Sequence, residues 1–230
     1  MAGINGNGDC GGVGGGERGE CITNHVDKGS MESHRLYLSR RTVLEMLRDR
    51  GYDVPDSELT RSLTEFRSLF GDNPDLLRLR ITVAHLSNPF KRIMVIFCGT
   101  DDIRTASVRS MYAQIMNIEH LKGLILILQS KINAFARKAL ENYPFKVELF
   151  QITELLVNIT KHIVMPKHEM LNAVEKQRLL SEYKVEDKKL PWMLETDAFA
   201  RYRGLEKGQV VKVTYSGGDA DSFETYRYVK

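Results

Sequence analysis

Apolar residues after Ser30 first follow the spacing of an amphipathic helix. They recur at three- and four-residue steps, with arginines on the remaining sides. This spacing predicts a helix that ends at Gly51, because glycine commonly follows the last helical residue. A second helix is expected from Asp56, a residue that favours the N-cap, to Gly71. The apolar positions of the first helix are Leu36, Val43, Leu44 and Leu47.

The period then changes to that of strands. Apolar and polar residues alternate over residues 77–86, which predicts a strand with one solvent-facing side. Buried strands at 92–97, 124–129 and 145–150 are expected to alternate with helices at 105–118 and 135–141. Strands that alternate with helices of this length favour a mixed or partly parallel sheet. Residues 30–150 are therefore predicted to form an α/β domain.

Residues 151–230 show a different pattern, with shorter strands and one charged helix at 174–183. Strands at 209–215 and 225–229 are expected to form a hairpin around the turn residues 217–219. The second domain is thus predicted as a small α+β unit, and the fold class of the whole chain as α+β.

Residues 1–29 carry ten of the 18 glycines and almost no bulky apolar side chain. Such a segment cannot offset the entropy of ordering itself, so it is predicted to be a flexible tail. Gly14, Gly16 and Gly19 have the spacing of a dinucleotide-binding motif. That motif needs a preceding strand and a following helix, and neither is expected here, so the match is not taken as a binding site.

Composition narrows the class of protein only modestly. A net charge of +3 over 230 residues does not by itself indicate a nucleic-acid-binding protein. Cys10, Cys21 and Cys98 form no CxxC pair, and Cys98 ends an apolar run where a packed, reduced thiol is expected. No apolar run is long enough to span a bilayer, so a soluble intracellular protein without a membrane partner is predicted.

Residues that could perform catalysis are few. A nuclease-like metal site could use only Asp75 and residues 186–188, which fall in different predicted domains. The histidines His162 and His168 could bind a metal only with a third ligand from elsewhere, so a structural or interface role is favoured. No nucleophile elbow, zincin motif or phosphate-binding loop occurs. We therefore predict no catalytic residue, no metal and no cofactor.

Four segments carry a family resemblance: VNITKHIVMPKH (157–168), LPWMLETDAFARYRGLEKGQVVKV (190–213), SHRLYLSRRTVLEMLRDRGYDV (33–54) and GLILILQSKINAFARKAL (123–140). They resemble the fifth subunit shared by the eukaryotic nuclear RNA polymerases, whose C-terminal domain also forms a separate small subunit of the archaeal polymerase. The form most similar to this chain is that of plant polymerase V. The resemblance implies a nuclear, non-catalytic polymerase subunit with an N-terminal jaw domain and a C-terminal assembly domain, acting in RNA-directed DNA methylation and transcriptional silencing.

The resemblance also implies which residues face the largest polymerase subunit and its neighbours. Two positions depart from the family pattern: Ala198 replaces a proline, and Trp192 replaces a common arginine. Trp192 could be a core residue or a contact for a partner particular to this polymerase. The expected assembly residues are Asn158, Thr160, His162, Pro166, Lys167, His168, Pro191, Trp192, Arg201, Tyr202, Gly204, Leu205, Gly208 and Val210.

A loop after the apolar strand at 124–129 is expected to face DNA. In the family this loop lies on the jaw that grips downstream duplex DNA and carries Thr-Pro-Ser, where this chain has residues 133–135 as Asn-Ala-Phe. Without the proline, trans peptide bonds are predicted. A plain polar surface loop is the alternative. The DNA-facing candidates, each expected to make weak backbone-directed contacts, are Lys131, Asn133, Ala134, Arg137 and Lys138.

Two other functions stay open at the level of the sequence. One is the equivalent subunit of polymerases I, II and III, against which the glycine-rich extension and the changed loop argue only mildly. The other is a free-standing DNA-binding or nuclease-related domain, which would bind or cut DNA by itself.

Overall fold

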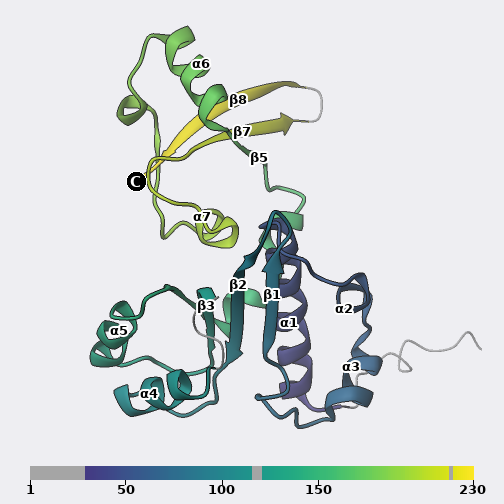
Figure 1. Ribbon diagram of the computed structural model, residues 1–230. Helices are drawn as coiled ribbons and strands as arrows, with labels where there is room; N and C mark the ends of the chain where they lie inside the picture. Colours follow the sequence, from purple (N-terminus) through teal and green to yellow (C-terminus); the bar gives the residue numbers. More distant parts are fainter. Residues whose placement is uncertain (1–28, 116–120, 218–219) are drawn as a thin grey trace, which may run out of the picture.

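Two packed parts make up the computed structural model, which describes residues 29–115, 121–217 and 220–230 (Figure 1). The predicted flexible tail therefore lies outside the described residues apart from Gly29, and so does most of the predicted turn at 217–219. The N-terminal part holds the long helix α1 and a four-stranded sheet, and the C-terminal part holds a second four-stranded sheet. This arrangement confirms the predicted α+β class.

The N-terminal helices begin and end at polar caps. Helix α1 (Met31–Asp49) begins where the Ser30 side chain accepts the Ser33 N–H, and the chain turns at Gly51, whose φ is +85°. The prediction of one helix from Asp56 to Gly71 is wrong. The chain forms two helices there, α2 (Asp56–Thr60) and α3 (Leu63–Phe70). Ser62 and Glu65 form a reciprocal capping box that starts α3 afresh, which explains the break.

The first sheet has the order β1-β2-β3-β4, with β1 (Ile81–His85) antiparallel to β2 (Asn88–Phe97). Strands β3 (Leu121–Leu128) and β4 (Lys146–Gln151) continue it in parallel, which confirms the mixed sheet. The strand expected from residue 77 begins only at Ile81. The preceding residues form a turn, in which the Asp75 side chain accepts the Leu77 N–H at 3.0 Å.

Helices cover both faces of this sheet. One buried cluster joins α1 to residues such as Val95 and Ile125, and a second joins the opposite face to α4 (Thr105–Ala113) and α5 (Ala134–Glu141). Helix α4 ends at Ala113, five residues before the predicted end at 118, and residues 116–118 lie outside the described residues. Cys98 is a buried free thiol in the second cluster, as predicted.

The second sheet has the order β5-β7-β8-β6 and is built around the predicted hairpin. Strands β7 (Val210–Gly217) and β8 (Ala220–Val229) pair antiparallel and are flanked by β5 (Lys167–Met170) and β6 (Trp192–Met193). Helix α6 (Ala173–Tyr183) confirms the predicted charged helix. The remaining elements are the 3₁₀ turns η3 (Ile152–Leu155), η4 (Ile159–Lys161) and η5 (Asp187–Lys189) and helix α7 (Ala198–Arg203).

The chain between the two sheets packs into the N-terminal core. Ile152 and Leu155 of η3 are each 2% exposed and belong to the cluster around α1, as does Tyr202 of α7. The predicted boundary after residue 150 stays a prediction. The contacts show that the two parts meet through shared apolar packing. Among the described residues, no helix is both long and apolar enough to cross a membrane.

Candidate assembly and nucleic-acid interfaces

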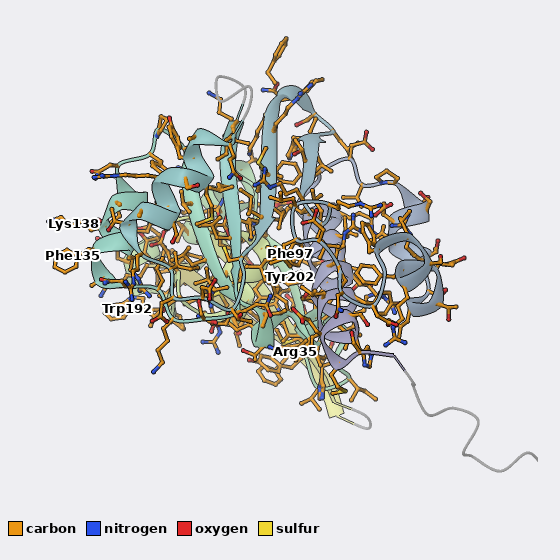
Figure 2. The ribbon with its side chains drawn as sticks, turned by 90° about the horizontal axis from the view of Figure 1, so that it is seen from below. Arg35, Phe97, Phe135, Lys138, Trp192 and Tyr202 are labelled. Atoms are coloured by element: carbon orange, nitrogen blue, oxygen red, sulfur yellow. The ribbon has the colours of Figure 1, made fainter. Side chains whose placement is uncertain are left out.

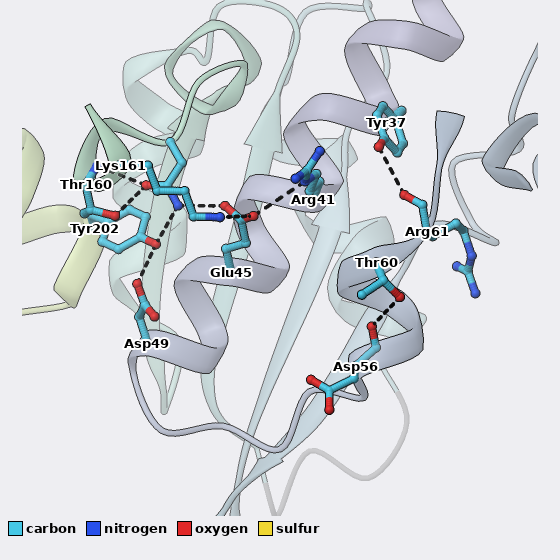
Figure 3. A network of polar contacts seen from close by, with 11 residues as sticks. Tyr37, Arg41, Glu45, Asp49, Asp56, Thr60, Arg61, Thr160, Lys161 and Tyr202 are labelled. Carbon is cyan, nitrogen blue, oxygen red and sulfur yellow. Dashed lines mark hydrogen bonds and ion pairs between the residues drawn. The ribbon is translucent and has the colours of Figure 1, made fainter. Parts of the chain in front are cut away.

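A polar network holds the segment 158–161 against α1 (Figure 3). The Asn158 amide donates to the Glu45 carboxylate at 2.7 Å and to the Tyr202 hydroxyl at 3.1 Å, and Lys161 forms an ion pair with Glu45. The Tyr202 hydroxyl in turn donates to Asp49 at 2.9 Å. The network therefore joins α1, η4 and α7 at one point.

Glu45 remains charged in this network although its side chain is only 8% exposed. Burial by itself raises the pKa of its carboxyl group. The hydrogen bonds from Asn158 and Lys161, with the charges of Lys161 and Arg41, outweigh burial, so its pKa lies below the ordinary value. A charged Glu45 thus stabilises the junction at neutral pH.

Arg50 forms a second junction at the end of α1. Its guanidinium meets the Glu148 carboxylate of β4 through two bonds of 3.0 and 2.7 Å. It also donates to the backbone carbonyls of Arg201 and Tyr202, at 2.6 and 2.9 Å. Gly204 allows this approach: its φ is +65°, and an added Cβ would lie 3.0 Å from Arg50 Cζ. The end of α7 is therefore docked on the N-terminal sheet through one arginine.

Arg201 fastens the other side of α7. Its guanidinium forms a bidentate pair with Glu154 at 2.9 and 3.0 Å and donates to the Leu149 carbonyl. The same group lies over the Phe150 ring, 4.5 Å from the centroid. Several of the predicted assembly residues thus make contacts within the chain: Asn158, Arg201, Tyr202 and Gly204 act at the junction, Thr160 donates to the Asn158 side chain, and Leu205, Gly208 and Val210 support the second sheet.

An exposed apolar groove lies beside this junction. Ile163 and Val164 are 96% and 78% exposed, and they face a groove of about 850 Å³. Two aromatic stacks line it: the His168–Phe199 stack, which we call its floor, with ring centroids 3.9 Å apart, and the Tyr215–Phe223 stack, with ring centroids 4.6 Å apart. The predicted residues Pro166, Lys167 and His168 line the groove, and His162 precedes Ile163 in the chain. We call the feature the 163–168 groove; its lining is Asp49, Thr160, Ile163, Val164, Met165, Pro166, Lys167, His168, Phe199, Arg203, Thr214, Tyr215 and Phe223.

His168 contributes an uncharged, fixed ring to the groove floor. Burial lowers the pKa of the imidazole below its ordinary value, against the opposing effects of the Pro166 carbonyl and Asp197. Its Nδ1 lies 2.7 Å from the Pro166 carbonyl oxygen. The floor therefore presents an aromatic surface, with the Arg203 guanidinium 6.0 Å from the centroid of the Phe199 ring.

Trp192 lies on the surface beside a second hollow of about 470 Å³. The side chain is 56% exposed, so in this chain it is not a core residue (Figure 2). Its indole N–H donates to the Lys188 carbonyl at 3.2 Å, and the Lys230 ammonium lies 3.7 Å from the ring centroid. Pro191, also exposed, accepts the Tyr228 N–H. The hollow shares Met165, Pro166, His168, Phe199 and Tyr215 with the 163–168 groove.

The predicted DNA-facing loop lies at the opposite end of the molecule's first sheet from the β1–β2 turn. Lys131, Asn133, Ala134, Arg137 and Lys138 are not buried, and every peptide bond of the loop is trans, as predicted. The Asn133 side chain accepts the Phe135 N–H at 2.9 Å and starts α5. A bridge between Ile103 and Ile132 sets the start of α4 beside the start of α5.

The residues considered for nuclease or metal chemistry have structural contacts instead of a shared site. Asp75 caps the turn before β1, and Asp187 pairs with Lys176 at 3.1 Å. Within the described part of the chain, no three histidine, cysteine or acidic residues lie close enough together to hold a metal ion.

Comparison with known proteins identifies the family. The model of the RNA polymerase Rpb5 N-terminal domain matches residues 30–115, and that of the Rpb5 C-terminal domain matches residues 157–229. The chain therefore belongs to the Rpb5 family of RNA polymerase subunits.

Individual relatives cover nearly its whole length. It is 54% identical over 209 residues to DNA-directed RNA polymerase V subunit 5C of Arabidopsis thaliana, covering 91% of this chain and 90% of the relative. Identity is 48% to subunit 5B of polymerases IV and V of the same plant, with 91% and 97% covered. The chain is 34% identical to RPABC1, a subunit of polymerases I, II and III of Caenorhabditis elegans, over 86% of this chain and 97% of the relative.

Proposed function

We propose that this chain is a non-catalytic subunit of a nuclear RNA polymerase V, where it helps the largest subunit assemble and contributes to the jaw that holds downstream DNA. It would act there in RNA-directed DNA methylation and transcriptional silencing. The observation that carries the proposal is the match along almost the entire chain to polymerase V subunits, with lower identity to the subunit shared by polymerases I, II and III.

The 163–168 groove supports the assembly role. Soluble proteins rarely leave side chains such as Ile163 and Val164 almost fully exposed next to an aromatic floor, and contiguous surfaces of this kind usually mark protein interfaces. The adjoining Trp192 is a rigid aromatic group held by Lys188 and Lys230, a type enriched among residues that dominate binding energy. We infer that the groove and the Trp192 hollow together contact the largest subunit.

The predicted assembly residues at the junction would also support the groove from within the chain. Arg201, Tyr202 and Gly204 hold α7, and α7 supplies Phe199 to the groove floor. A rigid groove loses less entropy on binding than a mobile one. The carboxylates with lowered pKa at this junction, Glu45 and Glu154, serve these contacts, which fits a structural role better than acid–base chemistry.

The test compares two surface variants of the tagged, full-length chain. Ile163→Asp with Val164→Asp places two charges in the groove and should reduce recovery of the largest polymerase V subunit at least tenfold, because charges at an apolar interface core are strongly unfavourable. Val174→Asp is the matched control, since Val174 of α6 is equally exposed at 78% but lies outside the groove. If the groove variant recovers as much of the largest subunit as the Val174→Asp control does, the groove is not an assembly surface.

A further inference from the structure

Strand β5 forms one edge of the second sheet. Among the described residues it pairs antiparallel with β7, and the N–H of Leu171, just after β5, donates to the Val210 carbonyl at 3.0 Å. In an antiparallel pair, alternate residues point their N–H and C=O groups at the partner strand, and the residues between them point theirs outward. The backbone groups of His168 and Met170 therefore point away from β7, at the edge of the sheet.

This edge is accessible from solvent. The Met170 side chain is 54% exposed, and Lys167 and Glu169 are exposed as well. Outward N–H and C=O groups on such an edge are a template for a further strand, and extended peptides bind many proteins in this way. Pro166 has no N–H, and its carbonyl oxygen lies 2.7 Å from His168 Nδ1, so the template begins at His168.

One face of β5 is apolar. His168 and Met170 lie opposite Val213 and Val211, which are 1% and 0% exposed, and the His168 ring stacks on Phe199. The exposed Met170 side chain lies at the open end of this face. A strand added beside β5 would place every second side chain over the same face, because side chains alternate between the two faces of a sheet. Apolar side chains at these positions would bury the Met170 side chain.

The other face of β5 is charged. Lys167 and Glu169 form an ion pair at 2.7 Å, and Lys212, opposite Glu169 on β7, pairs with Glu224 at 2.6 Å. Polar side chains at the alternate positions of an added strand would leave these charges hydrogen-bonded or solvated. The partner that this edge fits is thus an extended segment in which apolar residues alternate with polar ones.

We propose that the largest polymerase subunit adds such a segment to the second sheet as a fifth strand, hydrogen-bonded to His168 and Met170. This inference rests on the proposed function and adds how the largest subunit is bound. The edge is continuous with the 163–168 groove, because Lys167 and His168 belong to β5 and also line the groove. The turn that leads into β5 carries Ile163 and Val164, so a segment bound along the edge would meet these side chains next.

Amide hydrogen exchange measures the added strand directly. The tagged full-length chain is compared in the free state and within polymerase purified through it, and exchange is followed on peptides that cover residues 166–171. In the free chain the N–H groups of Glu169 and Leu171, which face β7, should be protected, and those of His168 and Met170 should exchange rapidly. In the polymerase the latter two should exchange at least tenfold more slowly, because both become donors to the added strand.

Proline substitution tests the same contact through recovery of the largest subunit. Met170→Pro removes the outward N–H of residue 170 and no hydrogen bond to β7, and proline is tolerated on the outer side of edge strands. It should lower recovery at least tenfold. Met170→Ala is the matched control: it shortens the side chain but keeps the N–H, so it should lower recovery much less. Thermal unfolding of each free variant shows whether it is folded.

Two measurements on the polymerase would overturn the inference. One is exchange of the His168 and Met170 N–H groups that is as rapid in the polymerase as in the free chain, and the other is recovery with Met170→Pro at the parent level. Equal losses with Met170→Pro and Met170→Ala would also overturn it, since they would assign the contact to the side chain. If Met170→Pro unfolds the free chain, the exchange of the unsubstituted chain decides.

Failure of this inference is distinguishable from failure of the proposed function. A parent chain that recovers no polymerase subunit would refute both. A parent chain that recovers the largest subunit without slower exchange at residues 168 and 170 would refute the added strand alone.

Discussion

Replacing Arg50 by methionine should be the most damaging single change at the junction between the two parts. The Arg50 side chain is only 6% exposed, and its loss leaves the Glu148 carboxylate, itself 18% exposed, without its cation. It also removes the side-chain donor to the Tyr202 carbonyl and leaves the Arg201 carbonyl with the Gly204 N–H alone. Removing one partner of a buried ion pair costs about 3–5 kcal/mol, and we take about 3 kcal/mol because water can partly reach Glu148.

A loss of this size corresponds to a fall in Tm of about 6–12 °C for a chain of this length. Urea and thermal unfolding of the purified chain would measure it, with Arg109→Met, an exposed arginine of α4, as the control. Arg50→Met with Glu148→Leu should recover much of the loss, because an apolar pair replaces the unpaired charge. An Arg50→Met variant that unfolds within about 0.5 kcal/mol of the parent, as surface changes do, would refute the reasoning.

Three further outcomes follow from individual groups. The pKa of the Glu45 carboxyl group is below its ordinary value of 4.5 in the folded chain, so the stability that its charge confers is present above pH 4.5 and is lost as pH falls through the folded pKa. In urea unfolding, Glu45→Gln should therefore flatten the dependence of stability on pH at acid pH, and an unchanged slope would contradict this. Burial raises the pKa of the Cys98 thiol to about 11. Alkylation of Cys98 at pH 8, followed by mass spectrometry of its peptide, should therefore be far slower in the folded chain than in urea, and equal rates would contradict a buried thiol. Trp192, the single tryptophan, should be quenched by iodide in the free chain and shielded after assembly with the largest subunit; quenching that persists would remove it from the interface.

The spacing of apolar residues predicted most helices and strands, because each of these elements buries one face and that face recurs with the period of the element. The strand at residue 124 and the helix at residue 135 were predictable from short runs alone, and both are present. Capping chemistry was harder to weigh: Ser62 and Glu65 carry the signature of a helix start, but the continuing helical period of Leu59, Leu63 and Phe66 masked it.

The junction contacts could not be predicted from spacing. Arg50 and Glu148 are 98 residues apart, and Asn158 and Glu45 are 113 apart, so no local pattern links them. The family resemblance predicted Asn158, Arg201 and Tyr202 as residues that bind other subunits, but it did not predict the contacts that they make within the chain. Only their positions in three dimensions show that they hold α7 and the segment 158–161 on α1.

The exposure of Phe135 could not be predicted from the pattern of apolar residues. An aromatic residue in a short amphipathic helix usually belongs to the buried face, so the sequence gives no sign that this ring points outward. Its 76% exposure, beside the buried Ala136, is visible only in the folded chain.

The identity of the polymerase that contains this chain is the most direct test of the proposed function. Tagged full-length chain would be expressed in plant cells at native level, and the largest polymerase subunits that co-purify with it would be quantified by mass spectrometry. We expect the largest subunit of polymerase V to be enriched well above that of polymerase II, and the Ile163→Asp, Val164→Asp variant to lose it. Dominant recovery of the polymerase II subunit, or of no polymerase subunit, would contradict a role in polymerase V.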